Sequence, residues 1–158
     1  MSRYQATVIW KNSGPDFLGN KYSREHQWQF EGGKTVEATA APDIVPQPWS
    51  NPANVDPEAA FVASLSSCHM LFFLYFAAKQ GYELESYQDQ AEGFLEKNHE
   101  GRMSMTRVIL RPKVSYAGAK VPDQDALDRL HHAAHEHCFI ANSVSTKITI
   151  EAGDTDLS

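Results

Sequence analysis

The sequence contains little cysteine and little positive charge. Only two of its 158 residues are cysteine, and 14 lysines and arginines stand against 20 aspartates and glutamates, for a formal net charge of −6 at pH 7. Two thiols are too few for the disulfide framework of a small secreted domain. Because the basic residues are few and scattered, a nucleic-acid-binding surface is not expected. The two cysteines are therefore inert, metal-binding or redox-active.

Targeting and linker segments are also missing. The first ten residues, MSRYQATVIW, lack the charged and apolar regions of a secretory signal, so we expect a cytoplasmic protein. No internal repeat, low-complexity tract or linker interrupts the chain. One domain is therefore predicted over residues 1–158, long enough to bury a real core.

Hydrophobic patterning predicts an α+β fold. Two helices are predicted, one beginning at Asp56 and ending near Gly81, and one over 122–139. Strands are predicted over 4–12, over 26–40 with a turn at Gly32–Gly33, over 85–118 as two or three strands around a turn at Asn98–Gly101, and over 145–152. The predicted element order is β-β-α-β-β-α-β.

The first predicted helix is unusually apolar. Residues 59–78 carry no charge, which meets the length test for a membrane span. The polar side chains of Ser64, Ser66, Ser67 and His69 lie at its middle, where hydrocarbon tolerates them least, so we expect no membrane partner. A helix that is apolar all round must be buried on every side. We therefore expect an intertwined homodimer in which two copies of this helix pack together.

Each cysteine has a histidine beside it, His69 after Cys68 and His137 before Cys138. The simplest interpretation is a small buried side chain with no chemical role. A metal site using His131, His135, His137 and Cys138 is a second interpretation, but neither an HExxH motif nor a CxxC pair is present. A hydrolase with His69 as the base of Cys68 is a third, although adjacent helical residues point about 100° apart.

Thiol redox chemistry is the remaining interpretation. It requires a stabilised thiolate, access for the oxidant and a second thiol that resolves the oxidised product. Cys68 and Cys138 are 70 residues apart and can meet only if the two predicted helices converge. Spacing alone leaves that question open.

Two segments carry a family resemblance. VDPEAAFVASLSSCHM, followed by HEHCFIANSV, resembles the OsmC/Ohr family, which comprises osmotically inducible protein C and the organic hydroperoxide resistance proteins. The likeness covers nearly the whole chain and is greatest to the broad OsmC-like branch. It implies an interwoven α+β homodimer with two active sites at the subunit interface. It also implies a peroxidase without metal or cofactor that prefers organic hydroperoxides.

The resemblance also implies roles for individual residues. Cys68 corresponds to the peroxidatic cysteine, Cys138 to the resolving cysteine and Glu58 to the acidic partner of an active-site arginine. For that arginine the first hairpin offers Arg24, whereas the alternative family position holds Pro48 and Trp49. The family further suggests a lipoyl-type dithiol as external reductant. The alternative function is a catalytically weak dimeric binding or stress-response protein without peroxidase turnover.

Two expectations concern the surroundings of Cys68. Apolar walls would favour alkyl or lipid-like hydroperoxides, and the candidates for them are Phe61, Met70, Phe72 and Phe73. Glu58 lies ten residues before Cys68, which is about 15 Å along one straight helix. Because a carboxylate cannot span that distance, we expect each site to take Cys68 and Cys138 from one chain and Glu58 from its partner.

Overall fold

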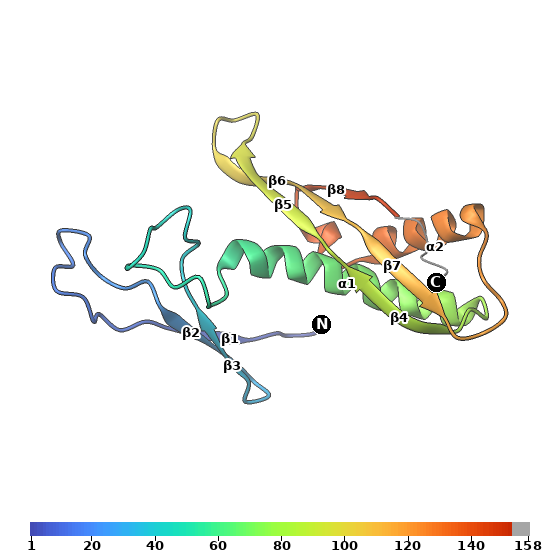
Figure 1. The fold of residues 1–158 in the computed structure, drawn as a ribbon, viewed down its shortest axis with the longest axis horizontal. Helices are drawn as coiled ribbons and strands as arrows, with labels where there is room; N and C mark the ends of the chain where they lie inside the picture. Colours follow the sequence, from blue (N-terminus) through green and yellow to red (C-terminus); the bar gives the residue numbers. More distant parts are fainter. Residues whose placement is uncertain (153–158) are drawn as a thin grey trace. The chain divides into compact units, whose positions relative to one another are not determined.

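The computed structural model describes residues 1–152. The chain divides into two compact units, Met1–Ala60 and Phe61–Ser158, which are described separately here. The architecture is mixed α+β, as predicted, with two α-helices and three small sheets in the described residues (Figure 1). Whether the units act as the single predicted domain stays a prediction.

The first unit contains a three-stranded antiparallel sheet in the order β1 (Ala6–Ile9), β2 (His26–Phe30), β3 (Thr35–Ala38). The predicted turn joins β2 to β3, with Gly33 at φ 89°, a left-handed conformation that glycine adopts without a Cβ clash. The segment predicted over 26–40 with a turn at Gly32–Gly33 is therefore a hairpin of two strands.

Helix α1 (Pro57–Lys79) begins and ends as the sequence predicts. Asp56 caps its first turn, since the Asp56 Oδ1 atom accepts the Ala59 N–H at 2.8 Å. Gly81, at φ 84°, ends it, and the Tyr82 N–H returns to the Ala77 carbonyl at 2.9 Å. Among the described residues, α1 alone is long and apolar enough to cross a membrane, judged by length and composition only.

A bent hairpin of four strands follows α1, where two or three strands were predicted. Its strands are β4 (Leu84–Asp89), β5 (Glu92–Lys97), β6 (Met103–Leu110) and β7 (Pro112–Tyr116). Asp89 lies opposite Pro112 and Glu92 opposite Ile109, so one register continues across the break (Figure 1). The predicted turn at Asn98–Gly101 joins β5 to β6, with Gly101 at φ 78°.

The break has a local cause at Arg111. Its backbone N–H donates to the Asp89 side chain at 2.6 Å instead of extending the strand ladder. The strands consequently separate here into a β4–β7 pair and a β5–β6 pair. A side-chain acceptor that interrupts backbone pairing in this way is not evident from hydrophobic alternation, which explains the wrong strand count.

The remaining elements complete the second unit. They are α2 (Gln124–His137), the short 3₁₀ helix η1 (Ala141–Ser143) and β8 (Lys147–Ile150), which pairs in parallel with β6. Asp123 caps α2 through its Oδ1 atom, which accepts the Ala126 N–H at 2.8 Å.

Two apolar clusters hold the second unit together, and α1 contributes to both. The cluster nearer the start of α1 contains Leu65 with Val108 and Leu110 of β6. The other contains Phe73 and Ala77 of α1, Val114 of β7 and Leu127, Leu130 and Ala134 of α2. The α1 segment between Leu65 and Phe73 therefore joins the two clusters, and it carries the first cysteine.

Candidate active site

Cys68 and Cys138 come from the two helices of the second unit. Cys68 lies in the middle of α1 and is partly exposed, whereas Cys138 follows the last residue of α2 and is only 1% exposed. Both are free thiols. Cys68 lies near enough to Cys138 to contribute to the raised pKa of the Cys138 thiol. The helices thus converge at the two cysteines, as thiol redox chemistry requires.

The two thiols have unequal environments. The pKa of the Cys138 thiol is raised to about 11, chiefly by burial; the Ala141 N–H opposes this rise and the neighbouring Cys68 adds to it. That N–H lies 3.4 Å from the Cys138 Sγ atom. Cys138 also lies at the negative end of the α2 dipole, which disfavours a thiolate. Cys138 is therefore protonated at neutral pH and is the weaker initial nucleophile.

A buried histidine pair lies beside the thiols. The His69 Nε2 atom of α1 and the His131 Nδ1 atom of α2 share a hydrogen bond at 3.0 Å, with ring planes 9° apart. His69 is 1% exposed and His131 is 4% exposed. Burial, followed by the charges of His131 and His135, lowers the pKa of His69 to about 3, and burial lowers that of His131 to about 4. Both imidazoles are neutral at neutral pH.

This pair removes support from two earlier interpretations. Because its pKa is lowered to about 3 and its ring is bonded to His131, His69 is too weak a base to take a proton from Cys68, which removes support from the hydrolase interpretation. The metal interpretation is weakened because His137, one of its proposed ligands, is engaged by the backbone. The His137 Nδ1 atom lies 2.9 Å from the Ala133 carbonyl. Within residues 1–152, no three His, Cys, Asp or Glu side chains are grouped so as to hold a metal ion.

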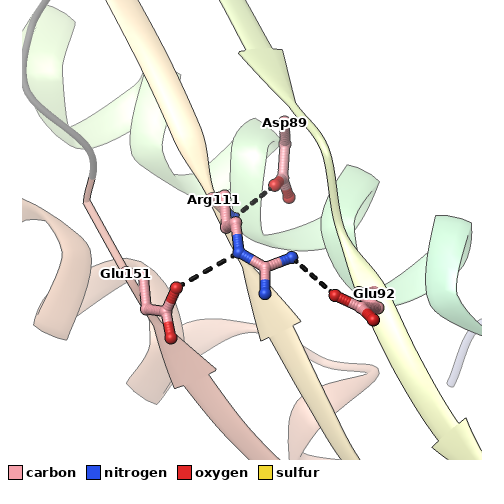
Figure 2. Close-up of polar contacts among 4 residues, drawn as sticks. All are labelled: Asp89, Glu92, Arg111 and Glu151. Carbon is pink, nitrogen blue, oxygen red and sulfur yellow. Dashed lines mark hydrogen bonds and ion pairs between the residues drawn. The ribbon is translucent and has the colours of Figure 1, made fainter.

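Polar contacts also tie α1 to the break in the hairpin. The Ser66 hydroxyl, two residues before Cys68, donates to Asp89 Oδ2, while Asp89 Oδ1 accepts the Arg111 N–H. Figure 2 shows the Arg111 guanidinium between Glu92, at 2.9 Å, and Glu151, at 3.1 Å. These partners raise the pKa of Arg111. Arg111 is therefore occupied by two carboxylates.

Glu58 and Arg24 belong to the other compact unit, Met1–Ala60. Glu58 lies in the first turn of α1. The guanidinium of Arg24 donates to the Tyr22 carbonyl at 2.6 Å and to the Asn20 side chain at 2.7 Å, and it lies 3.5 Å from the centre of the Tyr22 ring. The roles of both residues beside Cys68 stay predictions.

The four aromatic and apolar candidates for a substrate wall divide into different environments. Phe73 is fully buried between His131, at 4.5 Å between ring centres, and Tyr87, at 5.6 Å, so it belongs to the core. Phe72 packs edge-on against the exposed Phe139, beside Cys138, at 5.0 Å. Phe61 packs against the cluster of Leu65, and Met70 is partly exposed.

The sequence interpretation missed the link between His69 and His131. A usable signal existed, since His131 precedes Cys138 by seven residues and therefore lies on the same face of α2. His69 directly follows Cys68 in α1. Once the thiols are assumed to meet, the histidines are expected nearby. Asp89 was also missed, and no pattern in its own strand marks it.

Comparison with known proteins shows which family has this architecture. The family model described as OsmC-like protein matches residues 50–153. The chain belongs to the OsmC-like family. A solved OsmC-like protein of unknown function from Vibrio cholerae is 52% identical, with a TM-score of 0.95, over 97% of this chain and all of that one. No curated protein matches this chain.

Organic hydroperoxide resistance proteins share the OsmC-like fold at low identity. The OhrB protein of Bacillus subtilis is 17% identical with a TM-score of 0.67, over 96% of this chain and 98% of its own. An organic hydroperoxide resistance protein from Elizabethkingia anophelis is 17% identical with a TM-score of 0.68, over 97% of this chain and 98% of its own. The predicted family and its α+β fold are therefore confirmed.

Proposed function

We propose that this OsmC-like protein is a thiol-dependent peroxidase that reduces organic hydroperoxides. The observation that carries the proposal is the meeting of Cys68 and Cys138, one partly exposed and the other buried beside it. Two neighbouring free thiols, 70 residues apart in sequence, supply both a nucleophile and its resolving partner. The fold shared with organic hydroperoxide resistance proteins supports this choice of substrate.

The reaction proceeds in balanced steps. The Cys68 thiolate attacks the outer oxygen of the hydroperoxide, the O–O bond breaks, and the alkoxide takes a proton and leaves as an alcohol. Cys68 is then a sulfenic acid. The Cys138 sulfur displaces its hydroxyl as water and forms the Cys68–Cys138 disulfide. An external dithiol, for which we propose a lipoyl-type compound, reduces the disulfide and becomes oxidised itself.

The difference between the thiols supports this order. Cys138, buried and with a raised pKa, stays protonated until Cys68 has been oxidised. Cys68 is the more accessible of the two. Because His69 and His131 are neutral, neither supplies the cation that a thiolate needs. That role falls to an arginine, for which we propose Arg24, oriented by Glu58 through a bidentate ion pair.

We further propose that the active unit is a homodimer. Leu71 and Tyr75 lie one turn apart on α1 and are 60% and 59% exposed. Only 17% of the most apolar stretch of α1 is buried within one chain. A second α1 packed antiparallel across a two-fold axis would cover this face. It would also bring Glu58 of the partner subunit towards Cys68, which Glu58 of the same helix is too distant to reach.

The decisive experiment counts thiols. The reduced protein is mixed with cumene hydroperoxide, and free thiols and alcohol product are measured together. We expect two thiols lost for each alcohol formed, no consumption by the Cys68→Ser variant, and one stoichiometric oxidation by Cys138→Ser that leaves a dimedone-reactive Cys68. Retention of both thiols in the wild-type protein, or equal dimedone labelling of Cys68 and Cys138, would contradict the proposal.

Complementation tests the shared site. Cys68→Ser chains and Glu58→Ala chains are unfolded together and refolded, and heterodimers are isolated by differential tags. If Glu58 acts across the two-fold axis, one of the two sites in each heterodimer is intact and activity returns. Inactive heterodimers of confirmed composition would contradict the shared site.

A second function is favoured by one observation. The Arg24 guanidinium is already engaged by Asn20 and Tyr22 within its own unit. If that arrangement persists when a hydroperoxide is present, Cys68 has no cation, and the protein is a dimeric binding or stress-response protein without turnover. Arg24→Met separates the two functions, because it lowers the rate of thiol oxidation only if Arg24 activates Cys68.

A further inference from the structure

The His69–His131 contact and the Cys68–Cys138 contact join the same two helices. In α1 the residues are adjacent, and in α2 His131 precedes Cys138 by two turns, or about 10 Å along the axis. The histidine bond is one of few polar features in an otherwise apolar neighbourhood of Phe73, Leu130 and Ala134. The two contacts thus start from adjacent residues of α1 and reach residues that are two turns apart on the α2 side.

The histidine pair is held from several sides. The His131 ring stacks on Phe73 at 4.5 Å and 30°, which fixes its plane, and the hydrogen bond fixes its distance from His69. His135 and Asp128 of α2 are the charged or titratable neighbours that act on the pair, and Tyr87 of β4 packs against Phe73. A neutral pair shares one N–H between the two facing nitrogens.

Such a pair restricts how the helices can slide. Apolar burial is non-directional, so a shifted helix can recover contact area by repacking, whereas a 3.0 Å hydrogen bond between buried rings is broken by a shift of one residue, about 1.5 Å. A broken bond leaves two buried polar groups without partners. Buried polar contacts are known to select one register among several apolar packings.

We propose that His69 and His131 are positioning residues that hold α1 and α2 in the register at which Cys68 and Cys138 form a disulfide. They act through the helices and do not touch the substrate. The use of this register in turnover rests on the proposed peroxidase function. The tendency of the two thiols to form a disulfide does not, so it can be measured without any peroxide.

The test measures the equilibrium of the Cys68–Cys138 disulfide in glutathione redox buffers. Three proteins are compared: the wild type, a His69→Leu/His131→Leu variant without the bond, and a His69→Gln/His131→Asn variant. In the last, the Gln amide replaces Nε2 and the Asn amide replaces Nδ1, so a hydrogen bond is retained. We expect the leucine variant to lose about tenfold or more in the equilibrium constant, roughly 30 mV in reduction potential. The amide variant should stay within about threefold of wild type.

Unfolding in urea separates positioning from a merely structural role. Replacing a buried polar pair by apolar residues leaves stability equal or higher, so we expect a folded leucine variant with a poorer disulfide. The His131→Phe variant, which keeps the stacking on Phe73 but cannot bond His69, provides a second folded comparison. Wild-type disulfide equilibrium in either bond-free variant, or a loss in the amide variant equal to that in the leucine variant, would overturn the proposal.

The same variants distinguish this proposal from the peroxidase proposal. If the protein is not a peroxidase, the wild type yields no dimedone-reactive Cys68 with cumene hydroperoxide. The disulfide equilibrium constant in glutathione buffer should still be lower in the leucine variant than in the wild type and the amide variant. If it is a peroxidase, the sulfenic acid should persist longer in the leucine variant, because Cys138 resolves it more slowly.

Discussion

The two units of this OsmC-like protein are built by different means. Both apolar clusters consist entirely of residues from Phe61 onward. In the unit Met1–Ala60, the most buried side chains are small or polar, namely Ala38, Thr39, Ala41 and Ser50, while Val8 of its sheet is 65% exposed. Burial of apolar surface dominates folding energetics. The second unit therefore has its own source of stability, whereas the first has turns, hydrogen bonds and one aromatic cluster of Trp10, Phe17 and Tyr22.

The site residues divide along the same line. Both thiols and the histidine pair belong to the unit with the apolar clusters, whereas Glu58 and Arg24 belong to the other. Disulfide chemistry needs sulfur atoms held in a narrow geometry, which a packed core provides. This comparison suggests that the thiol geometry is the more rigid part of the proposed site, and the following predictions test it from the largest effect to the smallest.

The largest effect is expected in the core of the second unit. Phe73→Ala removes a fully buried ring that stacks on His131 and Tyr87, and we expect a loss of about 3–5 kcal/mol in the free energy of unfolding. The control in the first unit is Val8→Ala, for which a change within about 0.5 kcal/mol is expected. Chemical denaturation of both variants measures the difference. Equal losses of unfolding free energy in the two variants would contradict the difference between the two units.

Acid should destabilise the protein through the histidine pair. In the folded protein the pKa values of His69 and His131 are lowered from 6.5 to about 3 and about 4, so between pH 6.5 and 4 the unfolded chain binds more protons. The stabilisation is complete above pH 6.5 and is lost as the pH falls. At roughly 1.4 kcal/mol per pH unit for each of the two groups, we expect a total loss of about 4 kcal/mol by pH 5.

Urea unfolding measured at pH 7, 6, 5 and 4.5 checks this dependence. The His69→Gln/His131→Asn variant is the matched control, since its amides do not titrate and its slope over this range should be smaller. An identical pH dependence in the control would assign the effect to other groups.

Removing a helix cap should cost an intermediate and similar amount of stability in each unit. Asp56→Ala and Asp123→Ala each remove a side chain that accepts an N–H of the first turn at 2.8 Å. We expect a loss of about 1 kcal/mol from each, with Asn retaining most of the stability at either position. Thermal unfolding of the four variants is the measurement. A much larger loss at Asp56 would show that the start of α1 depends on more than its local cap.

The smallest effect is expected among the polar contacts of the first unit. Glu25 accepts the side-chain N–H groups of Asn51 at 2.8 Å and Asn54 at 3.3 Å, and it is exposed. Because solvent replaces such bonds easily, Glu25→Ala should cost about 0.5 kcal/mol or less. A loss above about 2 kcal/mol in chemical denaturation would mean that this polar network, and not apolar burial, holds the first unit.

Local signals in the sequence were enough for most of the secondary structure. Asp56, Pro57 and Gly81 determine the ends of α1 through groups within one turn of each end, and Gly33 and Gly101 mark turns that require a positive φ. These features depend on neighbouring residues only, so they can be predicted without knowledge of the fold. The family resemblance likewise rests on short segments around Cys68 and Cys138.

The predicted number of strands after α1 was wrong because it depends on a contact between residues far apart in the chain. The hairpin breaks because the Asp89 side chain takes the Arg111 N–H, a contact between residues 22 positions apart. Strand alternation continues on both sides of the break in the same register, so the sequence pattern contains no interruption to detect. Only the paired strands show where backbone hydrogen bonding stops.

By itself, the sequence determined the two helices, the ends of α1, the turns and the family, because each depends on residues close together in the chain or on motifs of known spacing. The family resemblance implied that Cys68 meets Cys138, whereas the tertiary structure alone decided that His69 meets His131. These pairs are separated by 70 and 62 residues, and no local preference brings them together. They meet because the apolar faces of α1 and α2 are buried in one core, which selects the partner of each polar group.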